Sequence, residues 1–153
     1  MTDPTSLPNF PPTPDEHPLR GRVLDALIDE GYEPNIDQDG DVAFTVQEQQ
    51  LFVRCMEGDF TVMRVFGQWQ VGDEVPQDLL SQLRACNELT LRLNVVKAGI
   101  ANGTLVVTGE HVIAAETELR ALLDVTIQLV LSAVHLWHET IMGRIPGAGT
   151  EPA

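Results

Sequence analysis

The chain has 153 residues, of which 43% are apolar, and this length fits one globular domain that buries about 70% of the surface of the unfolded chain. It carries 23 acidic against 9 basic residues, a formal net charge of -14, which opposes any approach to phosphate backbones or anionic lipid. We therefore exclude nucleic acid and membrane surfaces as partners. We also expect a soluble, cytoplasmic protein, because the first residues contain no basic leader and no apolar segment.

The sequence predicts a single domain over residues 18–142, between two tails. Residues 1–17 are rich in proline and threonine and lack periodicity, so we expect a disordered tail there. Residues 143–153 are expected to form a flexible C-terminal tail. After the first tail, apolar residues recur at helical spacing, with Pro18 suited to a first turn and Gly31 suited to the position just past the end. This segment is the first predicted helix.

From Asn35 to Val71, apolar residues alternate with a period of two, which predicts four antiparallel strands. With two-residue turns at Asp39-Gly40, Glu48-Gln49 and Gly58-Asp59, one face of this sheet is apolar and forms the floor of a core.

The other face mixes polar and apolar side chains, and it is our candidate partner-binding site. The residues assigned to it are Phe52, Arg54, Met56, Met63 and Val65. Methionines adapt to varied peptide segments, and an arginine adds one anchoring charge. The alternative is that a helix of the same chain covers this face.

Three aspartates at every second position, Asp37, Asp39 and Asp41, raise the question of a calcium loop. Counted from the first of them, Glu48 falls at the twelfth position, as such a loop requires, but the sixth position holds Val42 instead of glycine. The following residues also alternate as strands rather than forming a helix. We therefore favour a hairpin turn of the Asp-Gly type over a calcium site.

Pro76 opens a second predicted helix. Its apolar stripe comprises Leu79, Leu80, Leu83, Cys86, Leu89 or Thr90, and Leu93. Asn102-Gly103 is the strongest hairpin signal in the chain, and it predicts that Ile100 pairs with Leu105 and Ala98 with Val107.

The last predicted helix runs from about Ala115 to Met142 and is apolar around much of its circumference. Such a helix must be covered by more than one surface, so it is either central to the core or packed against a partner. For the second case we assign Ile127, Leu131 and Val134 to the interface of a homodimer.

His135 and His138 are three residues apart on this helix, a spacing at which two side chains can share a metal ion. They support an alternative function, a small-molecule or metal-dependent sensor or enzyme that uses these histidines and nearby acids. Such pairs also arise by chance, and no catalytic motif accompanies them. We expect no enzyme activity, no metal site and no cofactor. Cys55 and Cys86 lack metal-ligand spacing and are expected to be buried thiols rather than a disulfide.

Three segments and the closing long helix carry a family resemblance: LIDEGYEPNIDQDGDVAFTV, CNELTLRL (with Asn87) and VVKAGIANGTLVVTGE (with Lys97). Together with the order of elements, they resemble the YbjN-like family, also labelled bacterial sensory transduction regulators. The resemblance covers residues 18–142. It implies an α+β fold similar to type III secretion chaperones: an antiparallel sheet of five to six strands flanked by three helices, in the order α-β-β-β-β-α-β-β-α.

The resemblance also implies dimerisation and capture of partner peptides, with no enzyme chemistry and no cofactor. We therefore expect a non-enzymatic, chaperone-like or regulatory module. It would bind partner peptides or a second subunit through apolar surfaces of the sheet and of the last helix.

Overall fold

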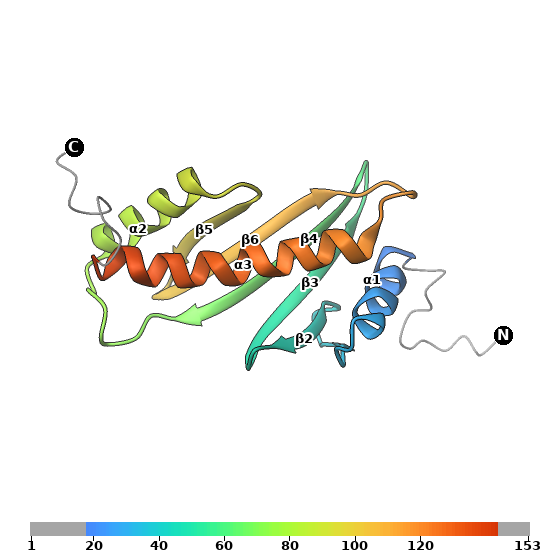
Figure 1. The fold of residues 1–153 in the computed structure, drawn as a ribbon, viewed down its shortest axis with the longest axis horizontal. Helices are drawn as coiled ribbons and strands as arrows, with labels where there is room; N and C mark the ends of the chain where they lie inside the picture. Colours follow the sequence, from blue (N-terminus) through green and yellow to red (C-terminus); the bar gives the residue numbers. More distant parts are fainter. Residues whose placement is uncertain (1–17, 144–153) are drawn as a thin grey trace.

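The computed structural model describes residues 18–143, so the tails predicted at residues 1–17 and 143–153 lie outside the described residues, apart from Gly143. Three helices and a six-stranded antiparallel sheet follow one another in the predicted order, which confirms the α+β fold (Figure 1). The elements are α1 (Pro18–Asp29), β1 (Asn35–Ile36), β2 (Val42–Val46), β3 (Gln49–Glu57), β4 (Thr61–Gln70), α2 (Leu79–Arg92), β5 (Val96–Ala101), β6 (Thr104–Val112) and α3 (Leu119–Ile141). The strands lie side by side as β1-β2-β3-β4-β6-β5.

All three helices cover the same face of the sheet. α3 runs across this face, with α1 near its N-terminal end and α2 near its C-terminal end (Figure 1). Both shorter helices contact α3, which places them on its side of the sheet. We call this side the helix face and the opposite side the open face.

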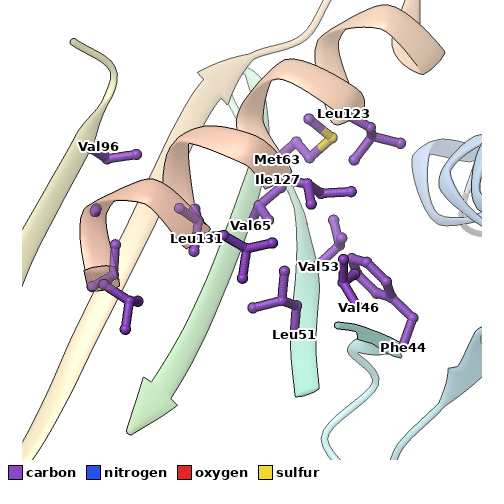
Figure 2. Packing of buried hydrophobic residues seen from close by; sticks show 14 of the residues in the cluster. Phe44, Val46, Leu51, Val53, Met63, Val65, Val96, Leu123, Ile127 and Leu131 are labelled. Carbon is purple, nitrogen blue, oxygen red and sulfur yellow. The ribbon is translucent and has the colours of Figure 1, made fainter. Parts of the chain in front are cut away.

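The core fills the space between α3 and the helix face (Figure 2). Leu123 and Ile127 of α3 lie close to Met63 and Val65 of β4, and all four side chains are almost fully buried. By length and composition α3 could cross a membrane, and a core helix meets the same criteria. Its apolar character is explained by this packing.

Local signals set the ends of the helices. Gly31 follows α1 with a φ of 95°, a conformation that favours glycine. α2 begins at Leu79 rather than near Pro76, because the side chain of Asp78 accepts a 3.0 Å hydrogen bond from the backbone N–H of Ser81 and caps the helix. The cap of α3 is Glu118, which starts that helix later than predicted.

Two of the predicted hairpins are close to the observed ones. Asn102 and Gly103 both have positive φ, and Ile100 pairs with Leu105 and Ala98 with Val107 as predicted. Between β2 and β3 the turn is Gln47-Glu48, one residue earlier than predicted. This difference moves the cross-strand partners by two residues, so each side chain keeps its face.

The hairpin between β3 and β4 differs from the prediction. Glu57 pairs with Thr61, so the loop has three residues, Gly58, Asp59 and Phe60, instead of two. A change of register by one residue moves every side chain of a strand to the opposite face. The faces predicted for β4 are therefore exchanged.

Candidate functional site

Met63 and Val65 do not belong to the partner-binding site to which we assigned them. Both lie on the helix face, are fully buried and pack beneath α3 (Figure 2). The three-residue loop before β4 is the cause, since Cys55 pairs with Met63 and Val53 with Val65. Phe52, Arg54 and Met56 lie on the predicted side of the sheet, because the side chains of β3 point to the sides that were predicted for them.

The residues that share the open face with Phe52, Arg54 and Met56 come from β4 and β6. Phe52 lies opposite Phe66, Arg54 opposite Arg64, and Met56 opposite Val62. The next strand adds three side chains opposite those of β4, namely Thr108, Glu110 and Val112. None of these residues of β4 and β6 was predicted to belong to the site. No local signal separates the two-residue Gly58-Asp59 turn from the observed three-residue loop, so the face of β4 could not be read from the sequence.

An aromatic pair occupies the middle of the open face. The rings of Phe52 and Phe66 are stacked with centroids 5.3 Å apart, and the guanidinium of Arg54 lies 5.1 Å from the centroid of the Phe66 ring. These contacts bury Phe66 from the open side, while Phe52 stays half-buried. Val112 is 69% exposed. No helix among the described residues covers this apolar surface.

Arg54 forms an ion pair with Asp41, the residue immediately before β2. Its Nε and Nη2 donate to the two carboxylate oxygens at 2.9 and 2.8 Å, a bidentate geometry. The hydrogen bond to Asp41, reinforced by its charge, raises the pKa of Arg54.

Arg64 and Lys97 share one carboxylate, that of Glu110. Nε of Arg64 donates to Oε2 at 2.7 Å, and Nζ of Lys97 lies 3.2 Å from Oε1. Burial alone would raise the pKa of Glu110, but the hydrogen bonds from Lys97 and Arg64 outweigh it and hold that pKa below its usual value. Three of the nine basic residues of the chain therefore lie on the open face.

The predicted dimer interface on the last helix is wrong. Ile127, Leu131 and Val134 are all buried within one copy of the chain. The sheet, α1 and α2 together cover most of α3, so these three side chains are at most 9% exposed and offer little surface to a partner.

The exposed apolar residues of the helices lie mainly on α2. Leu80, Leu83 and Leu91 are 60%, 43% and 75% exposed, whereas Ala85 and Leu89 are buried. At 100° per residue, Leu80 and Leu89 point in opposite directions from the helix axis, so the predicted stripe combined two separate faces. α2 is apolar on both sides, and one of them meets solvent.

His135 and His138 line a cleft of about 520 Å³ between α3 and the turn that joins β2 to β3. The other lining residues are Gln47, Gln49, Gln128, Leu131, Ser132 and Val134. Nδ1 of His138 donates to the backbone carbonyl of Val134 at 3.2 Å. Within residues 18–143, a group of three or more potential metal ligands forms only at the three aspartates, and these histidines are not part of it.

The three aspartates lie in the connection between β1 and β2, where a turn was predicted, but Ile36 pairs with Val42, so the connection is longer than the predicted two-residue Asp39-Gly40 turn. Oδ1 of Asp37 accepts hydrogen bonds from the backbone N–H groups of Asp39 and Asp41 at 2.9 and 3.0 Å, and Gly40 has a φ of 84°. The carboxylate of Asp41 is engaged by Arg54. Backbone geometry and ion pairing thus account for two of the three carboxylates.

Cys55 and Cys86 are both free. Burial raises the pKa of the Cys55 thiol to about 12 and also raises that of Cys86. Both residues therefore pack as small apolar side chains.

Comparisons with known proteins agree with this architecture. A family model described as T3SS (YopN, CesT) and YbjN peptide-binding chaperone 1 matches residues 17–152. Among solved structures, the crystal structure of an uncharacterized protein from Methanothermobacter thermautotrophicus is similar, with a TM-score of 0.60 and 14% identity over 82% of this chain and 97% of that chain. At this identity the likeness shows the fold alone. No curated protein matches the chain. The match to the family model confirms the resemblance seen in the sequence, and the chain belongs to the family of T3SS and YbjN peptide-binding chaperones.

Proposed function

We propose that the chain binds segments of partner proteins on the open face of its sheet and converts nothing chemically. The observation that carries the proposal is the stacked pair of Phe52 and Phe66 with Arg54 beside it, on a face that no helix of residues 18–143 covers. Membership of a peptide-binding chaperone family supports a protein ligand.

The chemistry of this surface suits a varied ligand. The half-buried ring of Phe52, held in place by stacking on the buried Phe66, offers apolar area at a fixed position, and Met56 supplies an unbranched, polarisable side chain on the same face. Arginine and aromatic residues are also the types that dominate binding energy at protein interfaces. The net charge of -14 disfavours nucleic acid and anionic lipid as alternatives. Two free thiols are in keeping with a reducing, cytoplasmic location, which is part of the proposal.

A peptide array tests this function. Purified full-length protein is applied to immobilised peptides of unrelated sequence, and wild type is compared with Phe52→Ser. The matched control is Phe60→Ser, because Phe60 is 64% exposed in the β3–β4 loop rather than on the open face. We expect wild type and the control to bind a common subset of peptides and Phe52→Ser to lose about tenfold in affinity for them. Equal binding by Phe52→Ser removes the open face from the proposal, and no binding by wild type contradicts peptide capture itself.

Self-association is also part of the proposal, through the exposed leucines of α2 rather than through α3. A second copy would cover Leu80, Leu83 and Leu91 by the same face of its own α2, as two-fold symmetry requires. Light scattering on wild type and Leu83→Glu measures this. We expect a dimer that the substitution converts to monomer, and a wild-type monomer at high protein concentration would refute it.

A further inference from the structure

A row of four charged side chains crosses the open face. Asp41 pairs with Arg54, Arg54 lies opposite Arg64 in the β3–β4 register, and Arg64 lies opposite Glu110 in the β4–β6 register. The order across the sheet is acid, base, base, acid. The two positive side chains are therefore neighbours, an arrangement that is unfavourable for directly opposed residues of a sheet.

Both arginines keep donors that the protein does not use. Arg54 engages Asp41 through Nε and Nη2, and Arg64 engages Glu110 through Nε. Within the described residues, no side chain or backbone group accepts a hydrogen bond from Nη1 of Arg54 or from either terminal nitrogen of Arg64. Their side chains are 40% and 34% exposed, so solvent or a ligand can reach these donors.

The positive charge on the Arg64 side of this row exceeds the charge of the one carboxylate that pairs with it. Arg54 is paired with Asp41 and is also within the electrostatic influence of Asp37 and Asp39, whereas Arg64 and Lys97 are both paired with Glu110. Around Glu110, two cations thus share a single carboxylate, in a chain whose net charge is -14. The surrounding negative field disfavours ligands with many acidic groups, while the local excess favours one carboxylate.

Apolar side chains lie on both sides of the charged row. Two residues further along the strands on one side are Met56 and Val62, and two residues away on the other side are Phe52 and Phe66. Two residues of a strand span about 6.6 Å, which is also the spacing of alternate side chains in an extended peptide. An extended ligand lying along β3 and β4 can therefore place three alternate side chains on these three rows.

We propose that the open face recognises a peptide segment with a single carboxylate, held between Arg54 and Arg64, and with an apolar side chain two residues away on each side. The inference rests on the proposed peptide binding and names the ligand class for it. The carboxylate separates the two guanidiniums, accepts the donors that the protein leaves unused and balances the excess charge. The carboxylate of an aspartate or glutamate and that of a chain end share this chemistry.

Defined synthetic peptides test the proposal. The first probe is an end-blocked heptapeptide with leucine at its second and sixth positions, glutamate at its fourth, and serine or threonine elsewhere. One matched peptide replaces the glutamate by glutamine, and another replaces both leucines by serine. A fourth peptide ends in leucine with a free α-carboxylate and is compared with its amide, which distinguishes a chain end from an acidic side chain. Affinities are measured by calorimetry with full-length protein.

Two protein variants complete the test. Arg64→Gln removes one of the paired cations and leaves Glu110 bound to Lys97. Arg84→Gln removes the same charge from the exposed surface of α2 and is the control. We expect the glutamate peptide to bind wild type and the control about tenfold more tightly than the glutamine peptide, and this preference to fall to less than about threefold in Arg64→Gln.

The outcomes separate this inference from the proposed function. If the glutamate and glutamine peptides bind wild type equally while the serine peptide does not bind, peptide capture stands and the carboxylate site is wrong. An unchanged preference in Arg64→Gln also overturns the inference. If no synthetic peptide binds, the inference fails, and the peptide array decides independently whether the protein captures peptides at all.

Discussion

Asp41 and Arg54 form an ion pair whose two members differ sharply in exposure: the carboxylate side chain is 4% exposed and the guanidinium side chain 40%. The unpaired group that remains therefore depends on which partner is removed. Arg54→Gln leaves a buried carboxylate, which costs free energy because water cannot solvate it fully. Asp41→Asn leaves a guanidinium that water reaches, and the new amide can still accept one hydrogen bond.

This asymmetry predicts the order of the two stabilities. We expect Arg54→Gln to lower the free energy of unfolding by about 2 kcal/mol and Asp41→Asn by about 1 kcal/mol. Urea denaturation at pH 7 measures both. Equal losses, or a larger loss for Asp41→Asn, would show that the exposure of the remaining unpaired side chain does not determine the loss of stability.

Gly109 of β6 gives a second prediction, because it lies under α3. A β-carbon added at Gly109 would be 2.8 Å from Cγ2 of Thr126, closer than packed carbon atoms approach. Gly109→Ala should therefore destabilise the protein by about 1–3 kcal/mol. Thr126→Ser removes that methyl group but keeps the hydroxyl, which donates to the carbonyl of Leu122 at 2.7 Å.

The matched test is a double-mutant cycle. Combined with Thr126→Ser, Gly109→Ala should cost at least about 1 kcal/mol less than it costs alone, since the space for the new methyl exists. If the losses of the two single variants simply add in the double variant, the strain in Gly109→Ala does not come from contact with Thr126.

The turn between β2 and β3 offers a stabilising change. Gln47 and Glu48 have φ angles of 51° and 66°, in the left-handed region that disfavours side chains of this kind. Asn102-Gly103 adopts a similar pair of positive φ angles with the residues that such turns prefer. Placing Asn-Gly at positions 47 and 48 should raise the free energy of unfolding by about 1 kcal/mol. Glu48→Gln controls for the lost charge, and an unchanged denaturation midpoint in the Asn-Gly variant contradicts the prediction.

The thiols provide a chemical test of burial. Because burial raises the pKa of Cys55 to about 12 and raises that of Cys86, the reactive thiolate is scarce at pH 8. We expect a thiol-specific disulfide reagent to label the native protein slowly and to label two thiols at once in guanidinium chloride. Rapid labelling of the native protein, or the absence of both thiols after unfolding, would contradict this.

Some local signals in the sequence were sufficient to predict the strands and their pairing. The period of two from Asn35 onward and the Asn102-Gly103 turn predicted strands and one complete register, because backbone geometry at that turn admits few alternatives. The β3–β4 loop was ambiguous, since both Gly58-Asp59 and a three-residue loop ending at Phe60 are acceptable turns. That single residue decided whether Met63 or Phe66 belonged to the open face.

Periodicity also could not say which apolar face of a helix would be covered. α2 carries leucines on opposite sides, and its packing against both α3 and β5 selects the buried side, where the Trp137 indole donates a 3.3 Å hydrogen bond to the carbonyl of Gln82. The ion pairs of the open face were equally hidden, because Arg64 and Glu110 are 46 residues apart in the chain. The residues of the candidate site are brought together by the pairing of β4 with β3 and β6, which the sequence alone does not determine.

The last prediction concerns pH and His111, which lies on β6 beneath α3. The Thr126 hydroxyl donates to Leu122, so it accepts at 2.8 Å from Nε2–H of His111, which fixes the neutral tautomer. Burial lowers the pKa of His111 in the folded protein. The unfolded chain takes up a proton at about pH 6.5, and the folded chain does so only at lower pH.

Above about pH 6.5, His111 is neutral in both states and does not lower the free energy of unfolding. As the pH falls from there to the pKa of His111 in the folded protein, protonation stabilises the unfolded chain, and the free energy of unfolding decreases. We expect the free energy of unfolding to decrease between about pH 7.5 and 5.5, a range in which unperturbed carboxylates stay ionised. His111→Gln should flatten this slope, because its amide can donate to Thr126 at every pH. A slope that is unchanged in His111→Gln, or a stability that rises on acidification, would assign the pH dependence to other groups.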